Sequence, residues 1–547
     1  MSKFIVFKSL DDIPDIAVSR ARMNWNKTGS WRSSTPSHED KTPPCNFNCP
    51  AGEDIRGYLD LLKHGKTKEA FELILQSNPM PLVCGRVCYH PCQSQCNRSG
   101  FDIAIDIRLM EKFMGEWGLE NYTPSKLPQL VSKKVAIIGA GPSGLSAGYY
   151  LRRKGVDVTI FDENEYPGGI LYYGIPSYRL PNDVLRPELD RILKGIDFRS
   201  RMRFGHDFDI GELENYDAVF LGTGAHKSKK MNIDGEDLPG VESGLAFLKK
   251  VNSGEKVSLE KKDVIAIGGG NTACDVARTA YRLGANVHLN YRRTEAEMPA
   301  FAEEIEQLKS EPIKIEFLAA PVRIVRRNEG KLGIEFIKMK LGKPDESGRS
   351  RPVPVAGSEF KVVADIIFAA IGEDPDLSFF SNADIRSGED FDFIKVDKRL
   401  RDKLFVGGDI LPNPRTVPHA VGSGRLAAEK IMAFFKGERL EQPKDIAVVA
   451  GPDDINLRYF AKVNLEKRRK ILFGGNGVIG EKQAIEEANR CFSCGVCYNC
   501  NNCYNFCPDM AVIKSSTGYQ INLDYCKGCG ICANECPCGS LRMDKAG

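Results

Sequence analysis

A glycine-rich turn between two apolar segments is the feature that most constrains the fold of this chain. It lies in Val135–Asp162, where a helix-forming stretch separates Val135–Ile138 from Val156–Phe161, two runs typical of buried parallel strands. The G-x-G-x-x-G spacing allows a tight turn, close approach of the backbone to a pyrophosphate, and close helix–strand packing. The sequence therefore predicts a dinucleotide site, the alternative being a tight turn without a ligand. The predicted contacts are Gly139, Gly141, Pro142, Ser143, Gly144 and, through hydrogen bonds from a ribose, Asp162.

Length and charge define the broad class of protein. For 547 residues we expect three to five domains, and a net charge of +3 gives no argument for nucleic acid or membrane binding. The first residues lack the pattern of a secretory signal, and no apolar run reaches the roughly 18 residues of a transmembrane helix. We therefore expect a cytoplasmic protein without a membrane span.

Eighteen cysteines need an explanation, because a reducing cytosol disfavours disulfides. Seventeen of them fall in two blocks, Cys45–Cys96 and Cys491–Cys538. The exception, Cys274, follows a second glycine-rich turn and is predicted to be a packed small hydrophobe. The segregation into blocks indicates metal clusters or redox thiols.

The N-terminal block predicts a small α-helical domain. Residues 1–40 are polar and predict an extended arm that lies on another part of the molecule. Apolar residues at helical spacing predict two short helices joined at His64–Lys66 and another over Ile103–Trp117. Gly85 and Pro91 favour a broken segment that wraps a cluster, the alternatives being zinc or buried thiols. This segment carries four cysteines at four-residue intervals, Cys84, Cys88, Cys92 and Cys96.

The region after the first turn is expected to extend the same domain. Tyr166–Val184 is rich in Gly, Pro and Tyr without periodicity, which suits a loop closing over a flat ring or an ordinary surface loop. Ala218–Gly224 predicts a buried strand ending in a Gly-Thr-Gly turn, and Leu245–Val251 predicts a helix.

The second glycine-rich turn follows the strand that begins at Val264. The next strand, Val287–Asn290, ends in Tyr291, Arg292 and Arg293 rather than in an acid. An acid suits a free ribose hydroxyl, whereas arginines favour a 2′-phosphate. We therefore predict an NADPH-preferring site, the alternative being that Arg292 and Arg293 are a solvated pair. The predicted contacts in the turn are Gly268, Gly270, Asn271, Thr272 and Ala273.

The order of the later strands places this second nucleotide domain inside the first. Residues 312–364 alternate apolar and polar and predict antiparallel strands that close the second domain. Ala364–Gly372 is similar to Ala218–Gly224, and Leu404–Ile410 predicts another buried strand before a turn into a helix.

The C-terminal tail contains two C-x2-C-x2-C-x3-C-P runs, the pattern of bacterial two-cluster ferredoxins. A charged linker, residues 435–490, with helical character at Asn464–Ile471 and Glu481–Asn489, precedes it. Cys538 has no place in the pattern and is predicted to be a free thiol. In such runs the fourth cysteine ligates the other cluster, which predicts one [4Fe–4S] cluster on Cys497, Cys500, Cys503 and Cys536, and a second on Cys507, Cys526, Cys529 and Cys532.

Six stretches in one order carry a family resemblance: CGRVCYHPCQSQC, IIGAGPSGL, GIPSYRLP, GGGNTACD, YRRTEAEMP and VGGDI. Over residues 40–435 the chain resembles the glutamate synthase small (beta) subunit and its relatives. These include the reductase half of dihydropyrimidine dehydrogenase and the large subunit of NADH-dependent ferredoxin:NADP oxidoreductase. The resemblance implies an α/β fold with two nested Rossmann-like domains of disulfide-reductase type, the outer one for FAD and the inserted one for the nicotinamide. It adds cofactor contacts at Gly169, Arg179, Leu180, Gly224, Gly372, Gly408, Asp409 and Val417.

The resemblance also implies two [4Fe–4S] clusters in the α-helical domain. One maps to Cys49, Cys88, Cys92 and Glu111, although Glu111 could instead be a surface acid, and Cys84 maps to a non-ligating cysteine. The other normally uses an Arg-Cys-x2-Cys pair before this region, and this chain has none there. Arg490 precedes such a pair near the other end of the chain. We hypothesise a fourth cluster on Cys45, Cys96, Cys491 and Cys494; the rival interpretations are four thiols or a cluster between subunits.

These features predict a cytoplasmic oxidoreductase subunit. Electrons would pass from NADPH (NADH less favoured) through FAD to the clusters and on to a ferredoxin or a partner subunit of a hetero-oligomer, or in the reverse direction. No protein acid or base is predicted to be catalytic. One alternative is an electron-bifurcating ferredoxin:NAD(P) oxidoreductase subunit, which would need a second flavin partner, and another is a non-catalytic iron–sulfur scaffold.

The predicted domains follow from these motifs. They are an arm and α-helical Fe–S domain (1–130), an FAD domain in two parts (131–255 and 364–440), an inserted NAD(P)H domain (256–363), a helical linker (441–490) and a small α+β two-cluster ferredoxin domain (491–547).

Overall fold

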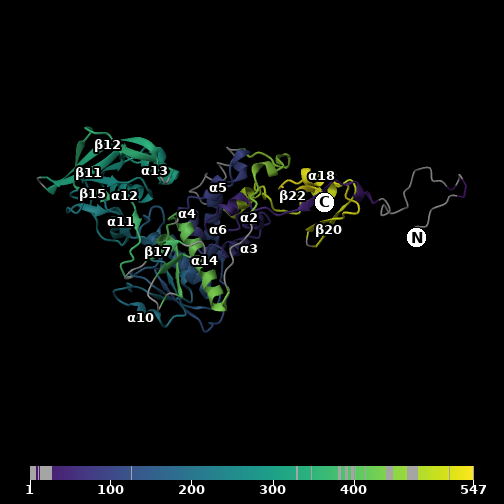
Figure 1. Ribbon diagram of the computed structural model, residues 1–547, viewed down its shortest axis with the longest axis horizontal. Coiled ribbons are helices and arrows are strands. Elements are labelled where there is room, and N and C mark those ends of the chain that lie inside the picture. The colour runs from purple at the N-terminus through teal and green to yellow at the C-terminus, as the bar shows by residue number, and fades with distance from the viewer. Residues whose placement is uncertain are drawn as a thin grey trace.

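A computed structural model gives the fold (Figure 1). One sheet domain lies at one end, the C-terminal segment at the other, and the N-terminal helices lie between them beside the remaining sheet. The structure describes residues 8, 9, 12, 27–124, 126–327, 330–345, 348–379, 384–387, 392–395, 400, 402–412, 414–438, 447–464, 479–516 and 518–545.

The first sheet is parallel and contains the first glycine-rich turn. Its strand order is β19-β5-β2-β3-β4, so that Ile137 of β2 lies between Ile160 of β3 and Phe220 of β5. These side chains are fully buried, as the apolar runs predict. The strands are β2 (Lys134–Ile138), β3 (Asp157–Phe161), β4 (Asp197–Arg199), β5 (Ala218–Leu221) and β19 (Leu404–Val406), and the helices packed with them are α7 (Pro142–Arg153), α9 (Asn182–Leu193) and α14 (Val417–Lys436).

The second sheet is also parallel and interrupts the first along the chain. Its order is β10-β9-β8-β15-β7, and an antiparallel sheet of four strands, β11–β14, adjoins it. Its elements are β7 (Val241–Ser243), α11 (Gly244–Asn252), β8 (Asp263–Ile267), α12 (Asn271–Arg282), β9 (Asn286–Tyr291), α13 (Ala302–Ser310), β10 (Lys314–Phe317), β11 (Ala319–Arg326), β12 (Leu332–Pro344), β13 (Ser350–Pro354), β14 (Phe360–Ala364) and β15 (Ile366–Ala369).

Strand pairing corrects the predicted boundaries between the two sheets. The sequence predicts β7 and α11 in the first part of the FAD domain (131–255) and β15 in its second part (364–440), but β15 pairs with β8 and β7 in the second sheet. β10, predicted to be antiparallel, pairs in parallel with β9. A short apolar run identifies a buried strand without showing which sheet it joins, and this is why the boundaries were misplaced.

The first two helices of the N-terminal helical domain form where the sequence predicts them. The two short helices are α2 (Ile55–Lys63) and α3 (Thr67–Ile74). The third, α6 (Ile107–Asn121), begins later than predicted because the Asp106 carboxylate accepts the Leu109 N–H at 3.1 Å and caps it. The cysteine segment is broken as expected, into α4 (Pro81–Val87), α5 (Pro91–Ser94) and η4 (Asn97–Gly100), after a short α1 (Pro44–Phe47).

The C-terminal segment packs against residues from the start of the chain. β1 (Ser34–His38) pairs antiparallel with β22 (Leu541–Lys545), and the Gly29 N–H donates to the Asp524 carbonyl at 2.8 Å. Residues 28–38 therefore form a strap on this module, which confirms that part of the predicted arm. The strap also contains η3 (Thr28–Trp31); the module contains α17 (Asn502–Asn505), β20 (Val512–Ser515), β21 (Gly518–Ile521) and α18 (Ile531–Asn534).

The structure also contains several shorter elements. Tyr166–Val184 is not only a loop, because it contains α8 (Ile170–Tyr173) and the start of α9. The helix predicted at Glu481–Asn489 is α16 (Glu481–Ala488), whereas the one predicted at Asn464–Ile471 lies, apart from Asn464, outside the described residues. Among the described helices, none is long and apolar enough to cross a membrane. The remaining short helices and strands are β6 (Lys227–Ser228), α10 (Ile210–Leu213), η5 (Glu295–Glu297), β16 (Glu373–Asp374), β17 (Asp384–Ser387), β18 (Asp392–Lys395), η7 (Gly408–Ile410), η8 (Pro452–Asp454) and η9 (Leu457–Tyr459).

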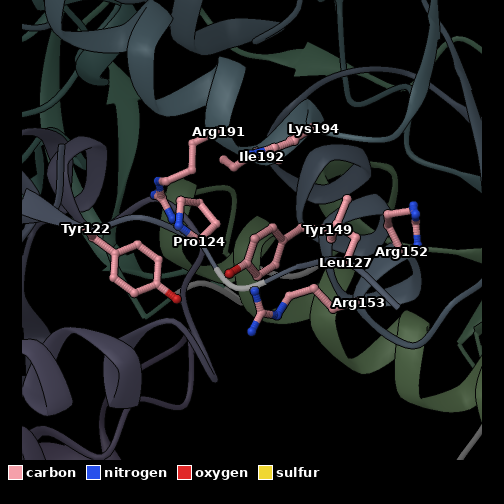
Figure 2. A pocket seen from close by; sticks show the side chains of 9 residues that line it. All are labelled: Tyr122, Pro124, Leu127, Tyr149, Arg152, Arg153, Arg191, Ile192 and Lys194. Carbon is pink, nitrogen blue, oxygen red and sulfur yellow. The ribbon is translucent and has the colours of Figure 1, made fainter. Parts of the chain in front are cut away.

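Arg191 joins the helical domain to the first sheet domain. It extends from α9, donates to the Pro79 carbonyl at 2.6 Å and lies 5.6 Å from the centre of the Phe71 ring. Figure 2 shows its guanidinium near Tyr122 and Pro124, where the chain crosses between the domains. The cavity there has a volume of about 20 Å³, enough for one water molecule, so the junction is tightly packed.

Removal of residues 1–38 is expected to loosen the C-terminal module, because β22 then becomes an unpaired edge strand. Backbone amides of residues 541–545 should exchange with deuterium roughly tenfold faster, as measured by mass spectrometry. A truncation of residues 1–26 keeps the strap and is the control. Equal exchange in the two truncated proteins would show that the strap does not stabilise the module.

Candidate functional site

The first glycine-rich turn lies at the carboxyl edge of the first sheet, between β2 and α7. Gly139 has a φ of 103°, and a Cβ at Gly144 would lie 1.9 Å from the Gly139 carbonyl oxygen. A Cβ at Gly141 would meet none of the described atoms within 4 Å. The turn is thus closed toward the sheet and open at the N-terminus of α7, where N–H groups favour an anion.

Buried polar atoms without partners surround this turn. Ser143 lies in the first turn of α7 and Thr223 in the turn after β5, and neither hydroxyl has a hydrogen-bond partner within the described ranges. A Cβ at Gly408, after β19, would lie 2.8 Å from the Cβ of Ser143, so three strand ends converge here. Unpaired buried hydroxyls fit a ligand rich in phosphate and hydroxyl oxygens, as a dinucleotide is.

Asp162 stabilises the turn itself, a role that sequence reasoning missed. Its carboxylate accepts hydrogen bonds from the Ala140 N–H at 2.7 Å and from the Asn164 N–H at 2.8 Å. Burial raises the pKa of this carboxyl, and these hydrogen bonds oppose the rise. Asp162 therefore lies beside the turn as predicted, and its contact with a ribose stays a prediction.

Asp409 lies in a cavity of about 280 Å³ on the same edge of the sheet. Burial raises the pKa of its carboxyl to about 6, while Arg415 lowers it. Gly408, His419 and Ser423 also line this cavity, which lies beside the N-terminal turn of α14. Val417 begins that helix, so these predicted contacts come from neighbouring elements.

Of the other contacts implied for the first domain, some lie at turns near the strand ends, whereas others are engaged with the protein itself. A Cβ at Gly169 would lie 2.9 Å from the Gly141 Cα, so this residue packs on the turn. Gly224 and Gly372 have φ values of 74° and 115°, which suit the turns after β5 and β15. Leu180 is buried in the hydrophobic core, and the Arg179 guanidinium is occupied by carboxylates of the second domain.

The second glycine-rich turn repeats the geometry of the first. Gly268 has a φ of 149°, and a Cβ there would lie 2.1 Å from the Ala370 carbonyl oxygen. Gly270 precedes α12, and Ala273 is fully buried in its first turn. The Asn271 side chain accepts the Phe301 N–H at 3.0 Å, which ties this turn to α13.

The two arginines after β9 have different surroundings. Arg293 is buried, donates to the Ser350 carbonyl at 2.9 Å and pairs with Asp345 at 2.5 Å. Arg292 is exposed, and its guanidinium has no hydrogen-bond or ion-pair partner in the described part of the chain. Arg293 is therefore not a solvated residue, and Arg292 is the member of the pair that is open to a 2′-phosphate.

Cys49, Cys88 and Cys92 form one group of buried thiols in the helical domain. Burial raises the pKa of the Cys92 thiol, and the nearby thiols of Cys49 and Cys88 raise it further. Cys84 of α4 is also buried, in the core that α4 shares with the first sheet and its helices. The structure thus brings together the three cysteines predicted for one cluster.

Two buried carboxylates lie beside this group. The Asn78 side chain donates to Glu111 at 2.9 Å and to Glu53 at 2.8 Å, and the His90 imidazole lies 2.9 Å from Glu111. Burial raises the pKa of Glu111 to about 8 and lowers that of His90 to about 4. Glu111 is therefore not a surface acid, and Glu53, which also acts on the pKa of Cys49, is a second candidate ligand that sequence reasoning missed.

A second group unites cysteines from both ends of the chain. Burial raises the pKa of the Cys45 thiol, and the thiols of Cys491, Cys96 and Cys494 raise it further. Burial likewise raises the pKa of Cys494 to about 12, with Cys491 adding to the rise. These four residues are the ones that the sequence hypothesis joins.

A buried ion-pair network anchors this second group. Arg490 pairs with Asp102 at 3.2 Å and with Glu487 at 2.6 Å, while Arg98 pairs with Asp102 at 2.8 Å. All four side chains are at most one-tenth exposed. The network fixes Cys491, the residue after Arg490, against the helical domain.

The C-terminal cysteines divide as the ferredoxin pattern predicts. Burial raises the pKa of Cys503 to about 12, and the thiols of Cys497, Cys500 and Cys536 contribute to the rise. A cavity of about 20 Å³ lies among the other four, Cys507, Cys526, Cys529 and Cys532. Among the described residues no three Cys, His, Asp or Glu side chains converge closely enough to hold a single metal ion, whereas a four-iron cluster takes ligands over a wider volume.

Two cysteines remain outside these groups. Cys274 is fully buried in the core of the second domain, as expected for a packed hydrophobe. Cys538 is buried, and its sulfur lies 3.8 Å from that of Cys536. It therefore lies beside the predicted cluster rather than at the surface.

Comparison with known families identifies the class of protein. Residues 133–424 match the pyridine nucleotide-disulphide oxidoreductase family. Residues 37–123 match the 4Fe-4S cluster domain described as dihydropyrimidine dehydrogenase domain II, and residues 519–542 match a 4Fe-4S binding domain. The chain belongs to the pyridine nucleotide-disulphide oxidoreductase family and is an oxidoreductase with iron–sulfur domains.

Three relatives illustrate where the chain lies within this class. It is 40% identical to the NADP(+)-dependent formate dehydrogenase subunit beta of Moorella thermoacetica over 72% of this chain and 60% of that protein, so it spans only part of that relative. It is 36% identical to the NADPH-Fe(3+) oxidoreductase subunit beta of Geobacter sulfurreducens over 83% of this chain and 75% of that protein. It is 34% identical to the glutamate synthase [NADPH] small chain of Escherichia coli over 72% and 89%, which confirms the resemblance.

Proposed function

We propose that this chain is an NADPH-dependent FAD and iron–sulfur oxidoreductase subunit. The proposal is supported by the presence, in one fold, of two glycine-rich turns at helix N-termini and four groups of neighbouring cysteine side chains. When bound, FAD would accept the hydride of NADPH and release single electrons to iron–sulfur clusters. The protein's own task is then to bind and orient these groups and to exclude water from them.

Nested Rossmann-like domains would supply the two nucleotide sites. The first sheet is completed by β19, which follows the whole second sheet along the chain. We assign FAD to the first domain because Ser143, Thr223 and Asp409 surround its turn with buried polar groups. The second domain, with the exposed Arg292 after β9, would take NADPH.

The thiol groups form a series from the helical domain to the C-terminus. Cys45 and Cys49 belong to neighbouring groups, and so do Cys494 and Cys497. Because only a few residues separate the two cysteines of each pair along the chain, the groups to which they belong lie next to one another. We propose [4Fe–4S] clusters in all four, with Glu111 or Glu53 as the fourth ligand beside Cys49.

The names of the relatives support a role within a larger assembly. Both the Moorella and the Geobacter proteins are named as beta subunits. We propose that this chain likewise exchanges electrons with a partner subunit or a ferredoxin. Its cytoplasmic location stays a prediction.

Substitution of Arg292 by Gln should weaken NADPH binding, because a 2′-phosphate would lose a charged hydrogen-bond donor worth about 1.5–3 kcal/mol. Flavin bleaching on anaerobic mixing should then require roughly ten- to hundredfold more NADPH, with the NADH dependence unchanged. Arg293→Gln is the matched variant. It should lower the melting temperature of the protein, since Asp345 and the Ser350 carbonyl lose a buried partner. An unaltered preference for NADPH in Arg292→Gln would reject this assignment, and absence of bleaching in the unmodified protein would reject the proposed function.

Substitution of Cys491 by Ser should remove one cluster. The unmodified chain should contain about sixteen iron atoms and the variant about twelve, as measured by atomic emission on anaerobically purified protein. Cys274→Ser, which changes a core thiol outside all four groups, is the control and should retain about sixteen. Full iron content in Cys491→Ser would mean that the group shared by the two chain ends holds no cluster.

A further inference from the structure

The segment around Arg179 belongs to the first domain but contacts the second. It lies between α8 and α9, yet the Arg179 guanidinium pairs with Asp275 of α12 at 2.6 Å and with Glu304 of α13 at 2.8 Å. These side chains are 11%, 6% and 8% exposed, so the ion pairs are screened from water. One guanidinium therefore joins two helices of the second domain to the first.

Tyr178 extends the same contact. The centre of its ring lies 4.8 Å from the guanidinium carbon of Arg278 and 4.1 Å from that of Arg282, both on α12. Arg278 is held in turn by Glu304 at 3.2 Å, the carboxylate that also binds Arg179. The two neighbouring residues thus engage one connected network of charges.

Such a network is better suited to fixing orientation than to adding stability. Burying several charges costs free energy that their attraction only partly offsets, and an apolar contact would hold two domains together at least as well. A planar guanidinium bound by two carboxylates, however, accepts few relative angles. The geometry is therefore directional, since small rotations of the second domain would break it.

The first turn of α13 connects this network to the other domains. Phe301 stacks on Tyr89 of the helical domain, with ring centres 5.0 Å apart and planes at 12°, and its N–H is held by Asn271 of the second glycine-rich turn. Glu303 pairs with Arg108 of α6. A cavity of about 520 Å³ lies between these contacts, lined by Tyr89, Phe301, Glu304 and Arg179.

We propose that Arg179, supported by Tyr178, is a positioning residue that sets the angle between the two nucleotide domains for hydride transfer. This inference rests on the proposed function, because it gives the network a role only if both domains bind dinucleotides. Arg179 acts through Asp275 and Glu304, and it need not touch either cofactor. Its effect should appear in the rate of flavin reduction rather than in the affinity for NADPH.

The test is single-turnover reduction of the complete, flavin-loaded chain by NADPH in stopped flow. In Arg179→Gln the rate at saturating NADPH should fall at least about tenfold, because small misplacements of reacting groups cost large factors in rate. The NADPH concentration giving half of that rate should change by less than about twofold, since Arg292 is untouched. Arg179→Lys keeps the positive charge but loses the planar guanidinium that binds both carboxylates. Its rate of flavin reduction should lie between those of the unmodified protein and Arg179→Gln.

Two further variants make the result decisive. Asp275→Asn removes the charge from the other side of the pair and should also slow reduction, which tests the idea if Arg179→Gln does not fold. Arg323→Gln breaks a pair with Glu335 within β11 and β12, far along the chain from the network, and should reduce at the unmodified rate.

Three outcomes would overturn the inference. They are reduction of Arg179→Gln and Asp275→Asn at the unmodified rate, loss of rate matched by an equal loss of NADPH affinity, and loss of rate matched by loss of bound flavin. Failure of the unmodified protein to be reduced at all would instead reject the proposed function.

Discussion

Burial of thiols in like groups is the constraint on which the rest of this structure depends. Burial raises the pKa of Cys45, Cys92 and Cys503, and the neighbouring thiols raise it further, so the thiolate forms repel one another. An iron cluster bound here would remove this conflict, because its iron atoms take thiolate ligands, which give up their protons on binding. The second group also requires the chain to fold back on itself, since Cys45 and Cys491 come from its two ends. Arg490, Asp102 and the β1–β22 strap hold that arrangement in place.

In the proposed function, the two sheets would connect the thiol groups to a source of electrons. Each places a glycine-rich turn at the N-terminus of a helix, and the second sheet is inserted before the last strand of the first. The helical domain contacts both, through Arg191 of α9 and through Phe301 beside α13. A single chain can therefore hold the sites for two-electron transfer between nucleotides next to the sites for one-electron transfer between clusters.

The sequence predicted well those features whose physical cause is local. Gly139 and Gly268 have the positive φ that their turns require. Cys536 lies near Cys503, and Cys507 lies with the other run, which is the grouping that the ferredoxin spacing predicts; ligation of clusters by these thiols stays a prediction. Features that depend on contacts between distant segments were missed or misplaced. β15 resembles a strand of the first sheet but pairs in the second, and Glu53 becomes a candidate ligand only when Asn78 brings it beside Glu111. Arg179 carries a family motif, yet its partners Asp275 and Glu304 could not be inferred from spacing.

In the proposed function, one chain converts the hydride of NADPH into single electrons on its own clusters. The most direct measurement is electron paramagnetic resonance of the purified protein, frozen at intervals after anaerobic mixing with NADPH. Signals of reduced [4Fe–4S] clusters should rise as the flavin absorbance bleaches, without any partner protein. Bleaching of the flavin with the clusters left oxidised would contradict it.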